Sequence, residues 1–176
     1  MPRLEPAFAR IQSWDERVCL RFNRALDHKA LNLLLRGISR LGDGLLWYAL
    51  MLAMLLTSER AAAPVAHMLA AGVICTAIYK LLKRGTLRPR PYQVHSRIAA
   101  GAPPLDRFSF PSGHTLHAVA FTFIAVCYYP WLAALLVPFT IVTGISRVVL
   151  GLHYPSDVLA GAAVGASIAL LSFLAL

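Results

Sequence analysis

The sequence predicts an all-α integral membrane protein: a helical bundle of about five to six spans with an amphipathic interfacial helix at its N-terminus. Of the 176 residues, 58% are hydrophobic and 14% are charged, whereas a soluble domain carries roughly 25% charged residues. Long uncharged runs separate the charges, and the mean hydropathy is positive. A chain of this length is expected to form one domain, 1–176, with interfacial helices in residues 1–42 and a transmembrane bundle in residues 43–176.

The N-terminal part of the chain begins with an amphipathic segment. In residues 4–26, apolar side chains recur every three or four positions, and charged side chains fill most of the gaps. This spacing is typical of a helix that lies in the headgroup layer of a membrane, with Trp14 as an interfacial anchor. Asp27 is placed to cap a second helix.

Five hydrophobic segments after residue 44 are the candidate spans. A span needs about 20 residues, so the short first segment, 45–57, is expected to continue residues 35–41 through a kink at Gly42-Asp43-Gly44. In the last segment, Gly161 and Gly165 form a small-residue face suited to close helix packing, which we expect within the monomer. The remaining segments are residues 61–82, 113–129, 131–147 and 156–176.

The formal net charge of +9 is better explained by a membrane than by nucleic acid. The basic residues flank apolar segments and are not interleaved with exposed aromatic side chains, so we expect the lipid bilayer and no nucleic acid as partner. The three cysteines are far apart, which argues against a disulfide framework or a zinc site. The sequence leaves the oligomeric state open.

Consecutive spans run in opposite directions, which determines the ends that share one side of the membrane. The ends of the second and fourth segments and the starts of the third and fifth fall on one face. The N-terminal helices lie on the same face. We therefore expect a single polar site there, built from Lys83, Arg90, His114, Arg147, His153 and Asp157.

A basic cluster follows the second segment. Lys83 and Arg90 are separated by six residues, and Arg88 and Arg90 each precede a proline. A positive-inside cluster accounts for part of this charge. Proline stiffens the backbone, however, so the guanidinium groups project from an extended segment. Guanidinium forks and a lysine ammonium group suit phosphate oxygens.

The third segment begins with Pro111-Ser112-Gly113-His114. Ser112 is a good N-cap, Gly113 permits close approach of the backbone, and the first-turn N–H groups are available to an anion. Taken alone, this motif is more typical of an ordinary capped helix with an interfacial histidine, but cations on the same face favour an anion site. His114 and His117 have no acidic or thiol partner at metal-ligand spacing, so we expect no metal and no cofactor.

The fourth segment ends at Arg147, where a charge is costly unless it is paired or functional. His153 follows six residues later, and Asp157 lies in the first turn of the last segment. A carboxylate close to a histidine fixes its tautomer and makes the other ring nitrogen a better nucleophile. We therefore expect His153, backed by Asp157, to attack a phosphorus atom. His114, with no carboxylate visible in the sequence, is expected to donate a proton.

Three motifs in this order, Lys83-x6-Arg90-Pro91, Pro111-Ser112-Gly113-His114 and Ser146-Arg147-x5-His153-x3-Asp157, resemble the signature of the type 2 phosphatidic acid phosphatases. That superfamily includes lipid phosphate phosphatases and vanadium haloperoxidases. The resemblance implies a metal-independent hydrolase of a lipid phosphate or diphosphate with a phosphohistidine intermediate at His153. It also implies that Asp157 orients this ring, that His114 protonates the leaving oxygen, and that the phosphate is bound by Lys83, Arg90, Ser112, Gly113 and Arg147.

The substrate is narrowed by the small amount of chain outside the membrane. Residues 92–110 form the only long loop on the catalytic face, which favours a small head group: a polyprenyl diphosphate, phosphatidylglycerol phosphate or phosphatidic acid. Two other functions stay open, a lipid phosphotransferase that uses the same phosphohistidine and a non-catalytic protein that binds or transports lipid phosphates. A pure binder would need the cations but neither histidine.

The side of the membrane that carries the site is ambiguous. The membrane is expected to be a bacterial inner membrane. Of the 17 Lys and Arg, all but Arg60 fall on the catalytic face, so the positive-inside rule favours a cytoplasmic site. The family resemblance favours the periplasmic face. The two indications disagree.

Overall fold

The structure, a computed structural model, describes residues 5–175, with side chains from residue 8 onward, and these residues form helices without any strand. The predicted all-α class is thereby confirmed. In chain order the elements are α1 (Glu5–Asn23), η1 (Arg24–Asp27), α2 (Lys29–Arg40), η2 (Leu41–Leu45), α3 (Leu46–Thr57), α4 (Ala62–Thr86), α5 (Pro91–Val94), α6 (Gly113–Tyr128), η3 (Pro130–Leu132), α7 (Ala133–Val149) and α8 (Pro155–Leu174).

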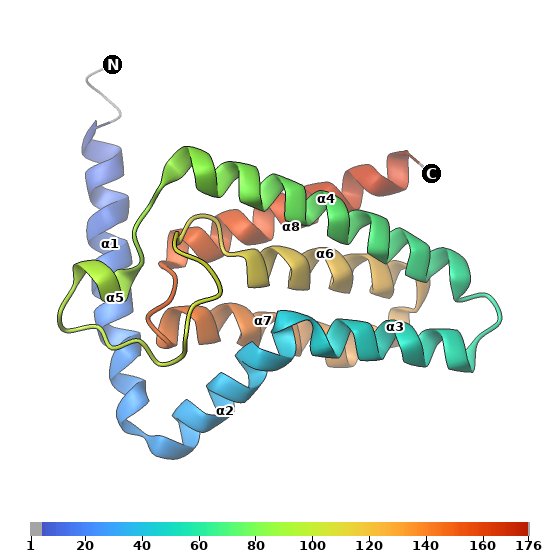
Figure 1. Cartoon of the computed structure of the whole chain (residues 1–176), viewed down its shortest axis with the longest axis horizontal. Helices are drawn as coiled ribbons and strands as arrows, with labels where there is room; N and C mark the ends of the chain where they lie inside the picture. Colours follow the sequence, from blue (N-terminus) through green and yellow to red (C-terminus); the bar gives the residue numbers. More distant parts are fainter. Residues whose placement is uncertain (1–4, 176) are drawn as a thin grey trace.

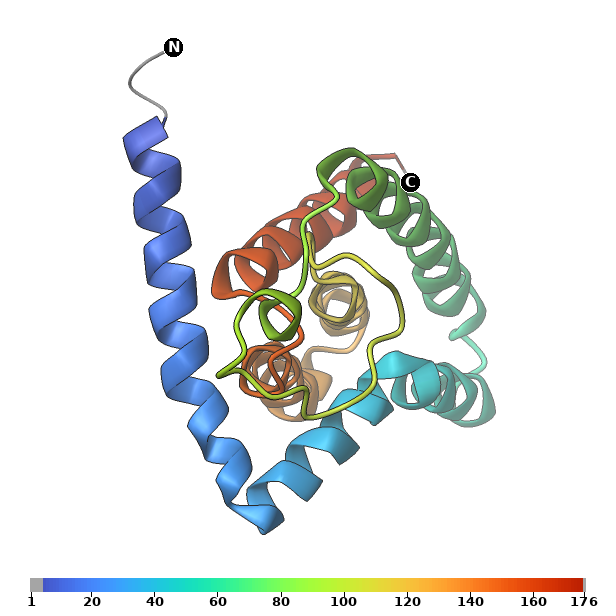
Figure 2. The same ribbon diagram turned by 60° about the vertical axis from the view of Figure 1, so that its left-hand side comes forward.

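Four helical segments among the described residues are long and apolar enough to cross a membrane, and they surround a fifth, shorter apolar helix. The shorter helix is α6, whose 16 residues lie at the centre of the bundle with the other helices around it (Figure 2). The predicted number of spans is confirmed. The four long segments are Lys29–Thr57, Ala62–Val94, Pro130–Val149 and Pro155–Leu174.

The first of these segments bends at the glycines where the sequence predicts a kink. The turn η2 between α2 and α3 is π-helical, and Gly44 has a φ of 136° within it. An L-residue with a side chain rarely adopts this φ, so glycine makes the bend possible. In Figure 1 α2 runs obliquely away from α3 and reaches the end of the bundle where α7 finishes. The bend thus brings α2 to the polar end of the molecule.

Helix α1 lies across that end, roughly at right angles to the bundle (Figures 1 and 2). Its apolar residues Phe8, Ile11, Trp14 and Phe22 are exposed. Its opposite face carries a stripe of side chains buried against the bundle, Asp15, Cys19 and Asn23. An exposed apolar face on a helix parallel to the membrane surface is what an interfacial helix requires.

The tightest helix contact joins α6 to α8 within the chain. A Cβ atom added to Gly165 would lie 2.3 Å from the carbonyl oxygen of Leu116, and one added to Gly161 would lie 2.5 Å from that of Ser112. The small-residue face predicted from the sequence therefore packs inside the monomer. Backbone atoms cannot move aside as a side chain can, so α8 can approach α6 only at glycine.

We expect Gly165→Ala to lower the melting temperature in detergent, because the added methyl group forces α6 and α8 apart. Overpacking of this kind costs about 1–3 kcal/mol. Gly37→Ala is the matched control, since no atom lies within 4 Å of the position of its added Cβ and alanine favours the helix. Equal melting temperatures for wild type and Gly165→Ala would contradict the packing described here.

Candidate active site

The polar site lies at the end of the bundle where α4 and α7 finish and α6 and α8 begin. The two loops between these helices, residues 95–112 and 150–154, close over it (Figure 1). Six of the eight site residues predicted from the sequence line one cavity of about 800 Å³. Ser112 and Asp157 are buried behind its wall. The six that line it are Lys83, Arg90, Gly113, His114, Arg147 and His153.

The imidazole of His153 is fully enclosed and has one nitrogen on each side of the site. Its Nε2 atom is 3.2 Å from Nη1 of Arg90. A guanidinium group only donates, so Nε2 is the acceptor and the proton of the neutral ring is on Nδ1. The Nδ1 atom faces Asp157. The unprotonated nitrogen thus points to the cations, which is the orientation that a nucleophile needs.

The neutral form of this ring is favoured by its surroundings. Burial lowers the pKa of His153 well below its usual value, and the positive charges of Arg147, Arg90 and Lys83 lower it further. The unprotonated Nε2 is therefore available throughout the neutral pH range.

Asp157 lies next to His153 but is bound more closely by other groups. Its Oδ2 atom is 3.7 Å from His153 Nδ1, longer than a hydrogen bond, and accepts the Tyr154 N–H at 2.8 Å. Its Oδ1 atom accepts from Arg88 at 2.6 Å. A charged guanidinium is a stronger partner for a carboxylate than a neutral imidazole. The predicted Asp157–His153 pair is thus adjacent but is not hydrogen-bonded.

Arg88 connects Asp157 to the interfacial helix. Its Nη2 atom donates to Asp15 at 2.7 Å, and Asp15 also accepts the N–H of Ser156 at 2.9 Å. Both carboxylates are inaccessible to solvent. The sequence suggested that Arg88 and Arg90 project together toward a phosphate, but the structure places Arg88 behind the site, where it joins α1 to the start of α8.

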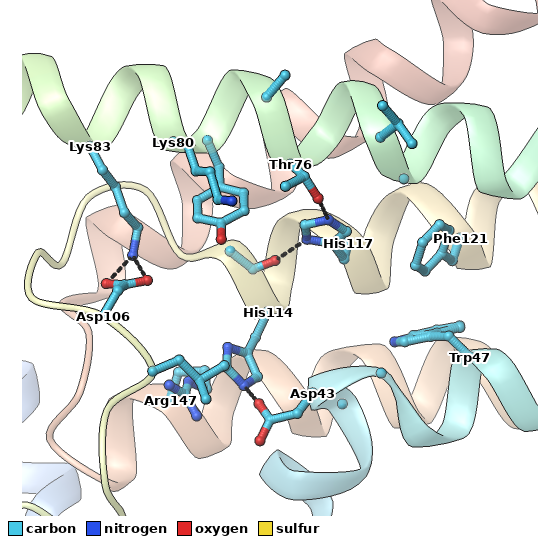
Figure 3. Close-up of a pocket in the computed structure, with 18 of the residues that line it drawn as sticks. Asp43, Trp47, Thr76, Lys80, Lys83, Asp106, His114, His117, Phe121 and Arg147 are labelled. Carbon is cyan, nitrogen blue, oxygen red and sulfur yellow. Dashed lines mark hydrogen bonds and ion pairs between the residues drawn. The ribbon is translucent and has the colours of Figure 1, made fainter.

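Lys83 and Arg90 form a cationic cradle that already holds a carboxylate. The Lys83 ammonium group donates to both oxygens of Asp106, at 2.7 and 2.8 Å, and Arg90 donates to Oδ1 at 2.8 Å. Burial opposes ionisation of Asp106, but hydrogen bonds and charge from Lys83 and Arg90 outweigh it and lower the pKa of this carboxyl. Figure 3 shows Lys83 and Asp106 at one end of the cavity. The sequence does not identify Asp106 as a site residue, because its position in the long loop is the only feature that sets it apart from other aspartates.

Arg147, the third cation that is predicted to bind phosphate, is buried and lines the same cavity. Its Nη1 atom donates to the hydroxyl of Ser39 on α2, whereas its Nε has no partner among the described residues. An unpaired guanidinium nitrogen at a buried position is costly unless a ligand satisfies it. Arg147 is therefore suited to bind an anion in the cavity.

Ser112 and Gly113 form the start of α6 as the sequence predicts. The Ser112 hydroxyl accepts the N–H of Thr115 at 3.5 Å and shares a hydrogen bond with the Thr115 hydroxyl at 3.0 Å. Ser112 thus caps the helix with its side chain, which leaves the Gly113 backbone to line the cavity. A phosphate contact by Ser112 stays a prediction.

His114 contacts a carboxylate that the sequence did not reveal. Its Nε2 atom is hydrogen-bonded to Asp43, which lies in the π-helical turn before α3 (Figure 3). The expectation that His114 lacks an acidic partner is therefore wrong. Gly42-Asp43-Gly44 has the composition of a turn, and residue spacing cannot show that a turn 71 residues away meets α6.

The other histidine of this helix has a structural role. His117 Nδ1 is 2.9 Å from the Gly113 carbonyl oxygen, and Nε2 is 3.1 Å from the Thr76 hydroxyl. Within residues 5–175, no group of three or more His, Cys, Asp or Glu side chains is arranged to hold a metal ion.

The cavity changes from polar to apolar along its length. Lys83, Asp106, Arg147 and His114 lie toward one end, and Trp47 and Phe121 lie toward the other (Figure 3). The apolar part is walled by α3, α4 and α6, which lie within the membrane-spanning part of the bundle. Such a cavity fits a molecule with an anionic head and a hydrophobic tail.

Most of the chain is similar to known proteins. Residues 46–176 match the model of the PAP2 superfamily. A decaprenylphosphoryl-5-phosphoribose phosphatase of Mycobacterium tuberculosis is 36% identical over 76% of this chain and 73% of the relative. A lipid A 1-phosphatase of Rhizobium johnstonii is 38% identical over 52% of this chain, and the match spans 39% of that relative.

The fold is shared with solved membrane proteins. A transmembrane PAP2-type phosphatidylglycerolphosphate phosphatase of Bacillus subtilis superposes with a TM-score of 0.76 at 26% identity, over 93% of this chain and 84% of the other. Aquifex aeolicus LpxE, at 24% identity, shares the fold with a TM-score of 0.79 over 90% of this chain and 93% of that one.

The fold, the family match and these relatives identify an integral membrane phosphatase that acts on phosphoric esters. The chain belongs to the PAP2 superfamily.

The neutral state of His153 makes folding stability depend on pH. The unfolded chain takes up a proton below a pKa of about 6.5, whereas the folded chain resists this proton because the pKa of His153 is lowered. We therefore expect this contribution to stability to be complete above pH 6.5. It should decline by about 1.4 kcal/mol per pH unit below it. The measurement is the difference in melting temperature between wild type and His153→Gln, which should shrink from pH 7.5 to 5.5. A melting-temperature difference that does not change with pH would contradict the neutral state assigned to His153.

Removal of Arg88 should destabilise the protein strongly, because it leaves Asp15 and Asp157 buried without their counter-charge. Breaking a buried ion pair costs about 3–5 kcal/mol. Thermal unfolding in detergent should show a large loss for Arg88→Ala and almost none for Arg84→Ala, whose side chain is exposed. Similar melting temperatures for the two variants would contradict the role of Arg88.

Proposed function

We propose that this protein hydrolyses a lipid phosphate or diphosphate through a phosphohistidine intermediate on His153 and without a metal ion. The observation that carries the proposal is Asp106, a carboxylate bound by Lys83 and by Arg90, whose guanidinium also contacts Nε2 of His153. We infer that an anionic substrate binds in the place of this carboxylate. A phosphoryl group that takes this place lies within reach of the unprotonated nitrogen.

In the first step, Nε2 of His153 attacks phosphorus while the bond to the leaving oxygen breaks. Lys83, Arg90 and Arg147 neutralise the charge that spreads over the equatorial oxygens. The proton that the leaving oxygen needs comes from His114. Asp157, behind the ring, stabilises the positive charge that His153 acquires when its Nε2 is phosphorylated.

In the second step, water releases the phosphate. His114 left the first step neutral, so it accepts a proton from the attacking water, and the bond between phosphorus and Nε2 breaks. Inorganic phosphate then leaves the cradle, and Asp106 can pair with Lys83 and Arg90 again.

The substrate we propose is a lipid with a small phosphate or diphosphate head. The curated relatives include phosphatases of decaprenylphosphoryl-5-phosphoribose and of undecaprenyl diphosphate. Leu105 and Asp106 of the loop 95–112 line the cavity, and this loop is the part of the chain that would contact the head group, which favours a small one. Polyprenyl diphosphate, phosphatidylglycerol phosphate and phosphatidic acid all satisfy these conditions.

The test is phosphate release by purified protein in detergent, with EDTA present, from a panel of these three lipids. We expect release from at least one lipid, and a phosphoenzyme that is stable to base and labile to acid when the reaction is quenched. His153→Ala should abolish both. His28→Ala, an exposed histidine, is the control and should change neither.

The alternatives predict different results. A phosphotransferase would release no free phosphate from a single pure lipid and would require a second lipid as acceptor. A binder would retain the lipid and form no phosphoenzyme. Near-normal turnover by His153→Ala would overturn the mechanism, and activity that EDTA abolishes and zinc restores would point to a metal enzyme.

A further inference from the structure

The contact between Asp43 and His114 brings a second carboxylate, in addition to Asp106, to the cavity. A carboxylate repels a phosphate, so its position beside the cavity requires another explanation. Its side chain is one-third exposed, whereas that of His114 is 7% exposed. Asp43 lines the same cavity as His114, but it contacts the ring rather than the cations of the cradle.

The backbone around Asp43 is built for this contact. A Cβ atom added to Gly42 would lie 3.3 Å from Thr143 and 3.9 Å from the imidazole carbon Cδ2 of His114, so η2 approaches both α7 and α6 here. Gly44, with its φ of 136°, turns the chain immediately afterwards. A single π-helical turn inside a helix is frequent at functional sites. Between the two glycines, the Asp43 side chain is directed at Nε2 of His114.

A bond at Nε2 decides which nitrogen can act on the substrate. With Asp43 at Nε2, the other nitrogen, Nδ1, is the one free to exchange a proton with the substrate. No described side chain or backbone group is hydrogen-bonded to it. A carboxylate on one nitrogen holds the ring in one orientation and stabilises the imidazolium form, as in other carboxylate–histidine pairs.

We propose that Asp43 is a positioning residue that acts through His114, so that this histidine can protonate the leaving oxygen. The inference rests on the proposed function, in which His114 is the general acid. During phosphorylation of His153, the bond from phosphorus to the leaving oxygen breaks, and the Nδ1 proton of His114 moves to that oxygen. The ring becomes neutral, and its Nε2 proton stays hydrogen-bonded to Asp43, which remains ionised throughout.

This role predicts a dependence on the leaving group. Phenolate, from an alcohol with a pKa near 10, needs a proton more than 4-nitrophenolate, a stable anion. The two aryl phosphates have almost the same shape, so binding differs little between them. The parameter kcat/KM reports only steps up to phosphoenzyme formation, which isolates the step in which the leaving group departs.

The experiment compares kcat/KM for phenyl phosphate and 4-nitrophenyl phosphate in wild type, Asp43→Asn, Asp43→Glu and His114→Gln, all purified in detergent. We expect Asp43→Asn to lose about tenfold or more on phenyl phosphate and much less on 4-nitrophenyl phosphate. Asp43→Glu should recover part of the loss, because it restores a carboxylate. Asp27→Asn, an exposed carboxylate that does not line the cavity, should leave both values unchanged.

Each pattern of results leads to a different conclusion about Asp43 and His114. A selective loss in both Asp43→Asn and His114→Gln supports the inference. A selective loss in His114→Gln alone overturns the role of Asp43 and leaves the proposed function intact. Equal losses on both substrates in Asp43→Asn also overturn it, because they indicate a structural role. If neither variant discriminates between the substrates, His114 is not the general acid, and both assignments fail. Melting temperatures identify a variant that does not fold. If Asp43→Asn does not fold, Asp43→Glu is compared with wild type instead, and a loss on phenyl phosphate that exceeds the loss on 4-nitrophenyl phosphate supports the inference.

Discussion

The catalytic end of the molecule depends on the guanidinium of Arg88, which joins two carboxylates that solvent does not reach. One of them, Asp15, belongs to the interfacial helix α1, and the other, Asp157, belongs to α8. Asp157 is also linked to α6, because its backbone carbonyl oxygen accepts the N–H of Ser112 at 3.0 Å. The helix that carries His114 and the helix that begins after His153 are therefore fixed to each other and to α1. An interfacial helix that could have been a simple anchor becomes part of the frame of the active site.

This frame also explains how many charges coexist in a small volume. Lys83, Arg90 and Arg147 surround the cavity, and without counter-charges their mutual repulsion would loosen the site. Asp106 offsets two of the three, and Arg88 is held away from the cavity by its own pair of carboxylates. The cations are thus in place before a substrate arrives. Preorganised charge of this kind stabilises a transition state without reorganisation during the reaction.

The sequence predicts the architecture and the end of the bundle where Lys83, Arg90 and His153 meet, because both follow from local pattern. Hydrophobic segments, a Ser112 cap and glycine faces depend on near neighbours in the chain, and alternation of the spans then places Lys83 and His153 on one face. The partners of the charged side chains cannot be predicted from near neighbours in the sequence. Arg88 and Arg90 look equivalent in sequence, yet one binds behind the site and the other within it. Asp15, Asp43 and Asp106 have no distinguishing local pattern, since their partners lie on other elements.

If a substrate phosphate takes the place of Asp106, as the proposed function requires, the carboxylate in the cradle would affect how the site discriminates among lipids. The protein is surrounded by membrane phospholipids, whose phosphodiester groups carry a single negative charge. A phosphodiester that displaced Asp106 would exchange one negative charge for another beside Lys83 and Arg90, with little electrostatic gain and a loss of loop contacts. A terminal phosphate carries a charge of about −1.5 to −2, so its exchange for Asp106 is favourable. A removable internal anion therefore favours terminal phosphates and diphosphates over the abundant diesters, even though no extramembrane domain is present among residues 5–175 to recognise the head group.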